Sequence, residues 1–252
     1  MLANPWNWAV PAAALLAMAE VWALEANRPL FLLLNRLAGI TGDALWSNLT
    51  VFGDVAVVFT LMLFFAGRDP RMVAALMLAA VPALLWVHGF KAPLGLPRPA
   101  AVLGVEQIHI IGPVLETKAF PSGHTATAFT LAGVLCLQSY PTAVRLLVLL
   151  MALLVGLSRV AVGAHWPLDV LGGAFGGWLA AVAGVWLAGR WSWSRGATAQ
   201  RAFALLFVTA AVWLLAGHDT RYPHARWLQY GIAVVALLVS APRLYRLFLP
   251  RA

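Results

Sequence analysis

The sequence has little charge and almost no cysteine. Only 10% of its 252 residues are charged, whereas a soluble domain carries about 25%. The one cysteine, Cys136, lies inside an apolar run, which excludes an internal disulfide framework and a cysteine-based metal site. We interpret Cys136 as a small buried side chain. Because 62% of the residues are hydrophobic, most of the chain is expected to face lipid or protein rather than water.

The positive net charge does not indicate a nucleic-acid partner in a chain of this kind. Lys and Arg outnumber Asp and Glu by 17 to 9, which gives a net charge of +8. In a soluble protein this excess would suggest a nucleic-acid surface. Here the arginines lie mostly in short segments between apolar runs, as in the cytoplasmic loops of membrane proteins. We therefore expect the chain to lie in a lipid bilayer and to bind no nucleic acid.

Eight apolar segments are candidates for membrane-spanning helices, because a span needs about 20 mostly apolar residues. The segment Arg28–Asn48 mixes apolar and polar residues, and we expect a short helix and a loop at the membrane surface there. The sequence thus predicts an all-α polytopic membrane protein. The candidate spans are residues 8–25, 51–66, 72–90, 122–140, 143–162, 168–189, 202–217 and 227–248.

Polar residues gather at four predicted helix ends that share one membrane face, because successive spans alternate in direction. The third span ends in KAPLGLPRP (91–99), and the fourth begins in PSGH (121–124). The fifth span ends and the sixth begins within SRVAVGAHWPLD (158–169). Ionisable groups at membrane depth are costly, so these residues are candidates for a functional site.

The cations and helix starts of this set suit a phosphate group. Lys91, Arg98 and Arg159 supply positive charge, and the two arginines supply forked donors. Each helix N-terminus offers free backbone N–H groups and a positive dipole end to an anion. Ser122 adds a hydroxyl donor, and Gly123 allows the backbone to approach a ligand closely.

Two histidines remain for proton and bond chemistry. His165 and Asp169 are four residues apart around a helix start, so the carboxylate can hold one imidazole nitrogen and leave the other free to attack. His124 can protonate a leaving oxygen. Taken singly, a His–Asp pair is often structural and a cation often snorkels to the interface. As a set they favour catalysis, and the set needs no metal or other cofactor.

The three motifs resemble the signature of the type-2 phosphatidic acid phosphatase superfamily. That signature reads Lys-x6-Arg-Pro, then Pro-Ser-Gly-His, then Ser-Arg-x5-His-x3-Asp, and this chain departs from it nowhere. The matching residues are Lys91, Arg98, Pro99, Pro121, Ser122, Gly123, His124, Ser158, Arg159, His165 and Asp169.

The resemblance implies a metal-independent lipid phosphatase with a six-helix core. His165 would carry a phosphohistidine supported by Asp169, and His124 would be the acid for the leaving group. Lys91, Arg98, Ser122, Gly123 and Arg159 would bind the phosphate. We expect a first helix and interfacial segment in residues 1–50, the catalytic core in 51–189 and two additional C-terminal spans in 190–252.

The orientation of the chain follows from its cations, once those of the site are set apart. With the N-terminus inside, nine arginines face the cytoplasm and eight cations face the other side. Removing Lys91, Arg98 and Arg159 leaves nine against five, which favours this orientation. The site would then face the periplasm from a bacterial inner membrane. The cytoplasmic residues are Arg68, Arg71, Arg145, Arg190, Arg195, Arg201, Arg243, Arg246 and Arg251.

Several alternatives stay open at this level. The substrate could be undecaprenyl diphosphate, phosphatidylglycerol phosphate, phosphatidic acid or a lipid A phosphate. A lipid-to-lipid phosphotransferase would use the same phosphohistidine, and a remote alternative is a lipid-binding or transport protein without catalysis. The loop His218–Arg226 shares the site's membrane face, where it either contacts the substrate or is merely solvated; the solvated loop is the simpler interpretation.

Overall fold

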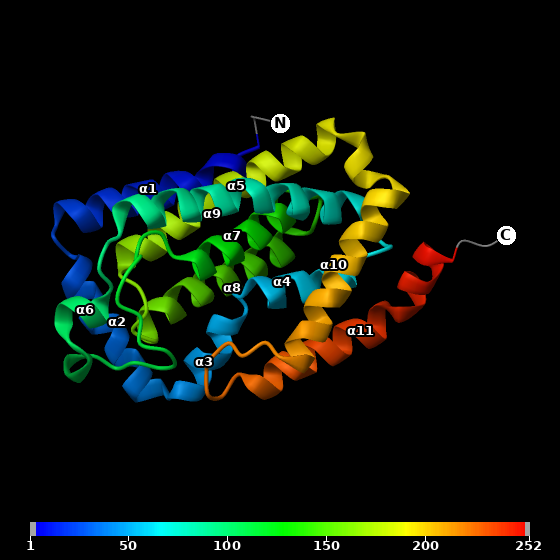
Figure 1. Ribbon diagram of the computed structural model, residues 1–252. Helices are drawn as coiled ribbons and strands as arrows, with labels where there is room; N and C mark the ends of the chain where they lie inside the picture. The colour runs from blue at the N-terminus through cyan, green and yellow to red at the C-terminus, as the bar shows by residue number, and fades with distance from the viewer. Residues whose placement is uncertain (1–3, 250–252) are drawn as a thin grey trace.

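The computed structural model describes residues 4–249, and within that range the chain forms helices and no strand (Figure 1). Arg251, one of the cations counted for the orientation, lies outside the described residues. The α-helices are α1 (Trp6–Ala23), α2 (Asn27–Thr41), α3 (Asp43–Val51), α4 (Val55–Leu61), α5 (Pro70–Leu94), α6 (Pro99–Leu103), α7 (Gly123–Cys136), α8 (Thr142–Ala161), α9 (Pro167–Arg190), α10 (Ala197–Ala216) and α11 (Arg226–Phe248). Three short 3-10 helices are η1 (Met62–Phe64), η2 (Val105–Gln107) and η3 (Ser192–Arg195).

The chain is the all-α, multi-pass membrane protein that the sequence predicts. The number of helices suited to span a membrane is smaller than the predicted eight. Within residues 4–249, five segments are long and apolar enough to cross a membrane. They are α5 together with α6, and the single helices α8, α9, α10 and α11. The number rises to seven if two bent pairs each count as one span. These pairs are α1 with α2, bent by 110°, and α3 with α4 and η1, bent by 65°.

The predicted span 122–140 is shorter than expected. Helix α7 has 14 residues and ends at Cys136. The polar residues Gln138 and Ser139 follow, and Pro141 disfavours a helical conformation at Tyr140. This stretch is therefore apolar enough for a span, but its helix is too short to cross a membrane.

The predicted span 51–66 is divided into two helices. Asp54 begins α4 by accepting hydrogen bonds from the backbone N–H groups of Ala56 (2.8 Å) and Val57 (3.4 Å). Gly53, just before it, lies against α7, where a Cβ atom would come within 2.7 Å of the His124 Cβ. The break thus lets the start of α4 approach the first turn of α7. The segment Arg28–Asn48, expected to be one short helix and a loop, instead forms most of α2 and the first part of α3.

Helix α9 is the centre of the bundle, and its glycines let other helices approach closely. A Cβ at Gly177 would lie 2.3 Å from the Ala126 carbonyl oxygen of α7, and a Cβ at Gly184 would lie 2.4 Å from the Ala75 carbonyl oxygen of α5. Trp178 of α9 is fully buried and donates from Nε1 to the Trp6 carbonyl oxygen at 2.8 Å, which joins α9 to α1. Close backbone packing of this kind is typical of helix contacts in membranes.

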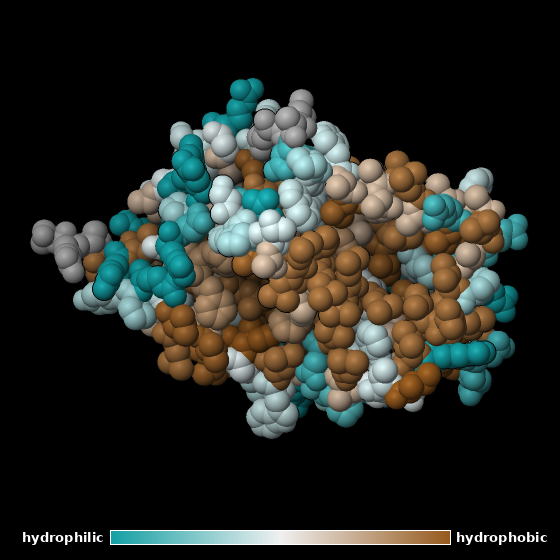
Figure 2. Space-filling model, turned by 180° about the vertical axis from the view of Figure 1, so that it is seen from behind, coloured by the Kyte–Doolittle hydropathy of each residue, from teal (hydrophilic) through white to brown (hydrophobic). Residues whose placement is uncertain are grey.

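The outer faces of the helices are apolar. Figure 2 shows a broad hydrophobic band across one face, with hydrophilic side chains mostly toward its ends. Large side chains such as Leu85 of α5, Leu147 of α8 and Leu238 of α11 are 59–70% exposed. A soluble monomer rarely exposes so much apolar surface, so these faces are suited to lipid.

The two C-terminal helices pack on the α4 side of the bundle rather than on α1 and α9. Phe207 of α10 contacts Phe59 of α4 with ring centroids 5.8 Å apart. Arg243 of α11 donates from Nη1 to the carbonyl oxygen of Phe64 at 2.8 Å. Helices α10 and α11 therefore extend the bundle beside α4 and η1, as Figure 1 shows.

We expect Gly184→Ala to destabilise the bundle, because the added methyl group meets backbone atoms of α5 that cannot rotate away. The loss should be roughly 1–3 kcal/mol, seen as a lower melting temperature in detergent. Gly189→Ala is the matched control on the same helix, since nothing lies within 4 Å of its Cβ position. Equal melting temperatures of the two variants would contradict the packing described for α9.

Candidate active site

The helix ends that carry the three motifs meet in space. Lys91 lies in the last turn of α5, and Arg159 lies in the last turn of α8. His124 is the second residue of α7, and Asp169 lies in the first turn of α9. The Ser122 backbone N–H donates to the Asp169 carbonyl oxygen at 2.9 Å, so the starts of α7 and α9 are joined directly.

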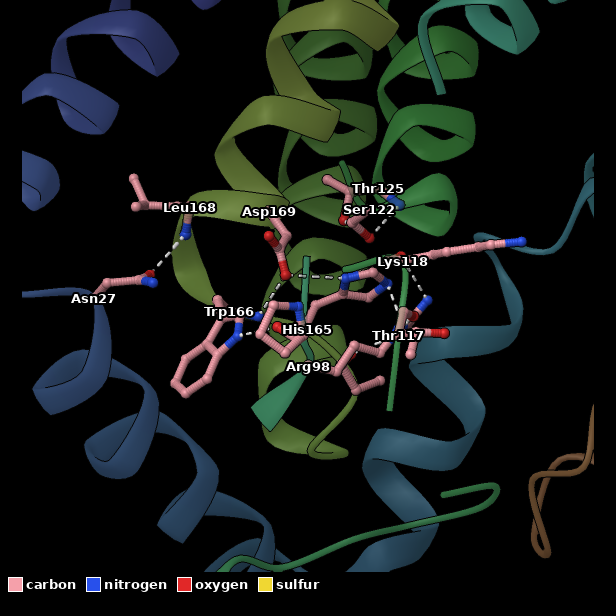
Figure 3. A network of polar contacts seen from close by, with 12 residues as sticks. Asn27, Arg98, Thr117, Lys118, Ser122, Thr125, His165, Trp166, Leu168 and Asp169 are labelled. Atoms are coloured by element: carbon pink, nitrogen blue, oxygen red, sulfur yellow. Dashed lines mark hydrogen bonds and ion pairs between the residues drawn. The ribbon is translucent and has the colours of Figure 1, made fainter. Parts of the chain in front are cut away.

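Asp169 orients His165 while it caps its own helix. Its Oδ2 atom accepts a hydrogen bond from the Trp166 backbone N–H at 2.9 Å and lies 3.3 Å from His165 Nδ1 (Figure 3). Pro167 occupies the first turn of α9, where its missing N–H costs nothing. The side chains of His165 and Asp169 are 3% and 5% exposed, so water does not compete for this contact.

The partners of His165 define which of its two ring nitrogens carries the proton. Arg98 Nη1 lies 3.2 Å from His165 Nε2, and a guanidinium can only donate. Nε2 therefore accepts, which places the proton of the neutral ring on Nδ1, toward Asp169. The lone pair of Nε2 is then the nucleophilic position of this histidine.

Arg98 also ties the segment before α7 to the site. Its Nε and Nη2 atoms donate to the carbonyl oxygens of Thr117 (2.8 Å) and Lys118 (3.2 Å), and Nη1 also donates to that of Ala164 (2.9 Å). Figure 3 shows Thr117 and Lys118 beside the Arg98 guanidinium. Arg98 is thus a structural clamp as well as a predicted phosphate ligand, which the sequence motif alone did not indicate.

The surroundings of His165 favour its neutral form. Burial lowers the pKa of His165 well below the ordinary value of 6.5, and the positive charges of Arg98, Arg159 and Lys91 lower that pKa further. His165 lies in the linker between α8 and α9, outside the helices that span the membrane. At neutral pH its imidazole is therefore unprotonated and able to attack.

Arg159 is held by two hydroxyl groups that the sequence reading missed. Its side chain is 2% exposed, and Nη1 donates to Thr50 Oγ1 and to the Tyr222 hydroxyl oxygen. The guanidinium also lies 5.6 Å from the centroid of the Tyr222 ring. A buried cation needs hydrogen-bond acceptors. The sequence thus indicated that Arg159 must have such acceptors, but not which residues supply them. Tyr222 belongs to the loop His218–Arg226, so this loop is not simply solvated.

Lys91, Gly123 and His124 line a cavity of about 600 Å³. Within residues 4–249, neither the Lys91 ammonium nor the His124 ring makes a hydrogen bond or ion pair with the protein. A Cβ at Gly123 would meet only Val87, at 3.7 Å. The protein itself therefore leaves room beside Gly123, and both polar side chains are free to meet a ligand.

Ser122 caps α7 and keeps a proton to donate. Its Oγ accepts from the backbone N–H of Thr125 at 3.4 Å and from the Thr125 hydroxyl at 2.9 Å. Both contacts use the oxygen of Ser122 as the acceptor, so its own O–H can serve an anion.

The described part of the chain holds no group of three His, Cys, Asp or Glu side chains placed to bind a metal ion.

The eight predicted site residues lie around the starts of α7 and α9. His165 contacts both Asp169 and Arg98, and its backbone N–H donates to the Arg159 carbonyl oxygen at 3.1 Å. Lys91, Gly123 and His124 share the cavity.

Comparison with known proteins shows a family and several relatives that this chain resembles. Residues 70–193, which include all eight predicted site residues, match the PAP2 superfamily. An undecaprenyl-diphosphatase of Sulfolobus acidocaldarius is 30% identical over 167 residues, covering 66% of this chain and 74% of the relative. A lipid A 1-phosphatase of Rhizobium etli is 31% identical, covering 52% of this chain and 65% of the relative. The crystal structure of Aquifex aeolicus LpxE has a TM-score of 0.59 and 30% identity, covering 66% of this chain and 96% of that chain.

We expect Tyr222→Phe to slow phosphate release without unfolding the protein, because it removes one acceptor of the buried Arg159 and keeps the ring. Loss of a hydrogen bond to a charged group should lower kcat/KM by about fivefold to tenfold. Tyr245→Phe is the matched control, since Tyr245 is 67% exposed on α11. If both variants matched the unsubstituted protein, the Tyr222 hydroxyl would have no part in holding Arg159 for the reaction.

Proposed function

The chain is a multi-pass lipid phosphatase that belongs to the PAP2 superfamily, as its motifs predicted. From this premise we propose that it acts through a phosphohistidine on His165. The observation that carries the proposal is the position of His165 between Asp169 at Nδ1 and Arg98 at Nε2. This geometry supports a neutral imidazole whose Nε2 lone pair faces the Arg98 guanidinium, and a bound phosphate would take the Nη1 donor in place of Nε2.

In the first step, His165 Nε2 attacks phosphorus, and the bond from phosphorus to the lipid oxygen breaks. His124, which the bound anionic phosphate would keep protonated, gives its proton to that leaving oxygen. In the second step, water attacks the phosphohistidine, neutral His124 accepts a proton from this water, and the N–P bond breaks. Inorganic phosphate leaves, and His165 and His124 return to their starting states. The absence of a protein partner for the His124 ring within residues 4–249 supports this role.

Positive groups around the phosphate would stabilise the charge on its oxygens. Lys91 is free to form an ion pair, and Arg98 and Arg159 supply guanidinium groups from two other elements. The N-termini of α7 and α9 add backbone N–H groups and their positive dipole ends, and Ser122 and Gly123 lie at the first of these. Because the two arginines and the backbone N–H groups are fixed by the fold, they need little rearrangement in the transition state. We propose that this set acts without a metal ion.

The substrate that this site fits is the phosphate or diphosphate of a membrane lipid. The headgroup would enter the polar helix ends while the hydrocarbon remains within the bilayer. The candidates are undecaprenyl diphosphate, phosphatidylglycerol phosphate, phosphatidic acid and lipid A phosphates. With the cytoplasmic arginines on the opposite side, the site would face the periplasm of a bacterial inner membrane.

Phosphate release by the detergent-solubilised protein tests this function. We expect turnover of at least one of the four lipids in the presence of EDTA. His165→Ala should reduce that turnover by a factor of about 10⁴ or more, as expected for loss of a nucleophile. His224→Ala is the matched control, because His224 is an exposed histidine of the loop His218–Arg226.

The outcomes of this assay separate the open alternatives. Full activity of His165→Ala would overturn the proposed mechanism. Transfer of labelled phosphate to a lipid acceptor, with none released as inorganic phosphate, would identify a phosphotransferase. Binding of a lipid phosphate with neither release nor transfer would leave only the non-catalytic alternative.

A further inference from the structure

The cavity that reaches Lys91 and His124 is polar at one end only. Away from these residues it runs between α4, α5 and α10. Its walls there are apolar and include Val55 and Phe59 of α4, Leu84 of α5, and Leu206, Ala210 and Trp213 of α10. A volume of about 600 Å³ is within the usual range of a ligand pocket.

Helix α10 contributes one continuous wall of this cavity. Leu206, Ala210 and Trp213 are spaced at i, i+4 and i+7, so they lie on one face of the helix. This helix lies outside residues 70–193, the part of the chain that matches the superfamily. The wall is therefore an addition of this chain to the matched catalytic region.

The cavity opens sideways from the bundle. Leu84, Leu206 and Trp213 line it and are 54%, 40% and 54% exposed. These residues belong to helices that are long and apolar enough to span a membrane, so their exposed faces meet lipid. Gln200 Nε2 donates to the Pro70 carbonyl oxygen at 3.2 Å, which joins the starts of α10 and α5. Figure 1 shows the two helices diverging from this point.

A second His–Asp pair fixes the end of α10 beside the polar end of the cavity. His218 Nε2 lies 2.9 Å from Asp54 Oδ2, and both residues line the cavity with Lys91 and His124. From α11, Gln229 Nε2 donates to the carbonyl oxygens of His218 (2.7 Å) and Leu214 (3.1 Å). The position of the α10 wall relative to the catalytic residues is thus held by three separate polar contacts.

We propose that this cavity is a groove for one hydrocarbon chain of the substrate, and that α10 makes the enzyme prefer long chains. The proposal rests on the proposed function, because the groove begins where the phosphate would be bound. A chain attached to that phosphate would continue along Phe59, Leu84, Ala210 and Trp213 and leave through the lateral opening into the bilayer. Burial of successive methylene groups along these walls would favour a long chain over a short one.

Two isoprenyl diphosphates with the same headgroup and different chain lengths test the groove. Farnesyl diphosphate would reach past Ala210, whereas dimethylallyl diphosphate would end near the polar mouth. Ala210→Phe fills the groove, and Thr209→Phe, at an exposed position that also lines it, does so without disturbing a buried residue. Val212→Phe is the matched control, because Val212 is on the same helix, does not line the cavity and is 50% exposed.

We expect Ala210→Phe and Thr209→Phe each to lower kcat/KM for farnesyl diphosphate by about tenfold or more. For dimethylallyl diphosphate, kcat/KM should stay within about twofold of the value for the unsubstituted protein. Val212→Phe should change neither. An equal loss for both substrates, or no loss for either, in the Thr209 variant would overturn the groove.

Binding separates failure of the groove from failure of the proposed function. If the unsubstituted protein hydrolyses neither compound, the proposed reaction fails for isoprenyl diphosphates. The groove is then decided by the affinity of the His165→Ala protein for farnesyl diphosphate. If adding Thr209→Phe to this protein weakens its binding of farnesyl diphosphate by about tenfold, the groove is supported. Unchanged binding would overturn it.

Discussion

The carboxylate of Asp169 is the group on which the arrangement of the site depends. It caps α9 through the Trp166 N–H and holds His165 Nδ1, while the carbonyl group of the same residue accepts the Ser122 N–H at the start of α7. One residue therefore sets the direction of a helix, the tautomer of the nucleophile and the distance between two anion-binding helix starts. Because the residue is buried, none of these contacts is exchanged with water.

Close packing along α9 makes this convergence possible. The glycines of α9 bring α5 and α7 to backbone contact, so the helix ends that carry Lys91 and His124 are held beside the start of α9. The glycine at position 53 does the same for the start of α4, which lies directly against His124. Small residues thus decide where the charged ones meet, although they carry no chemistry themselves.

The sequence predicted most of the long helices and all the motif residues around the site, because apolar length and ionisable groups at membrane depth are strong signals. It did not predict the division of residues 51–66 or the short α7, since these depend on a cap at Asp54 and on the polar residues before Pro141. Thr50 and Tyr222 were also missed. Their role arises only when distant parts of the chain meet Arg159, and a neutral hydroxyl side chain gives no sign in the sequence of such a partner.

Detection of phosphate on His165 is the most direct test of the proposed mechanism. The detergent-solubilised protein would be mixed with a lipid phosphate, quenched in base within milliseconds to seconds, digested and analysed by mass spectrometry under conditions that preserve phosphohistidine. The mechanism predicts a phosphorylated peptide that contains His165, which is lost on His165→Ala and persists longer when His124→Ala slows its hydrolysis. Steady turnover without any phosphorylated His165, or with phosphate on a different residue, would contradict it.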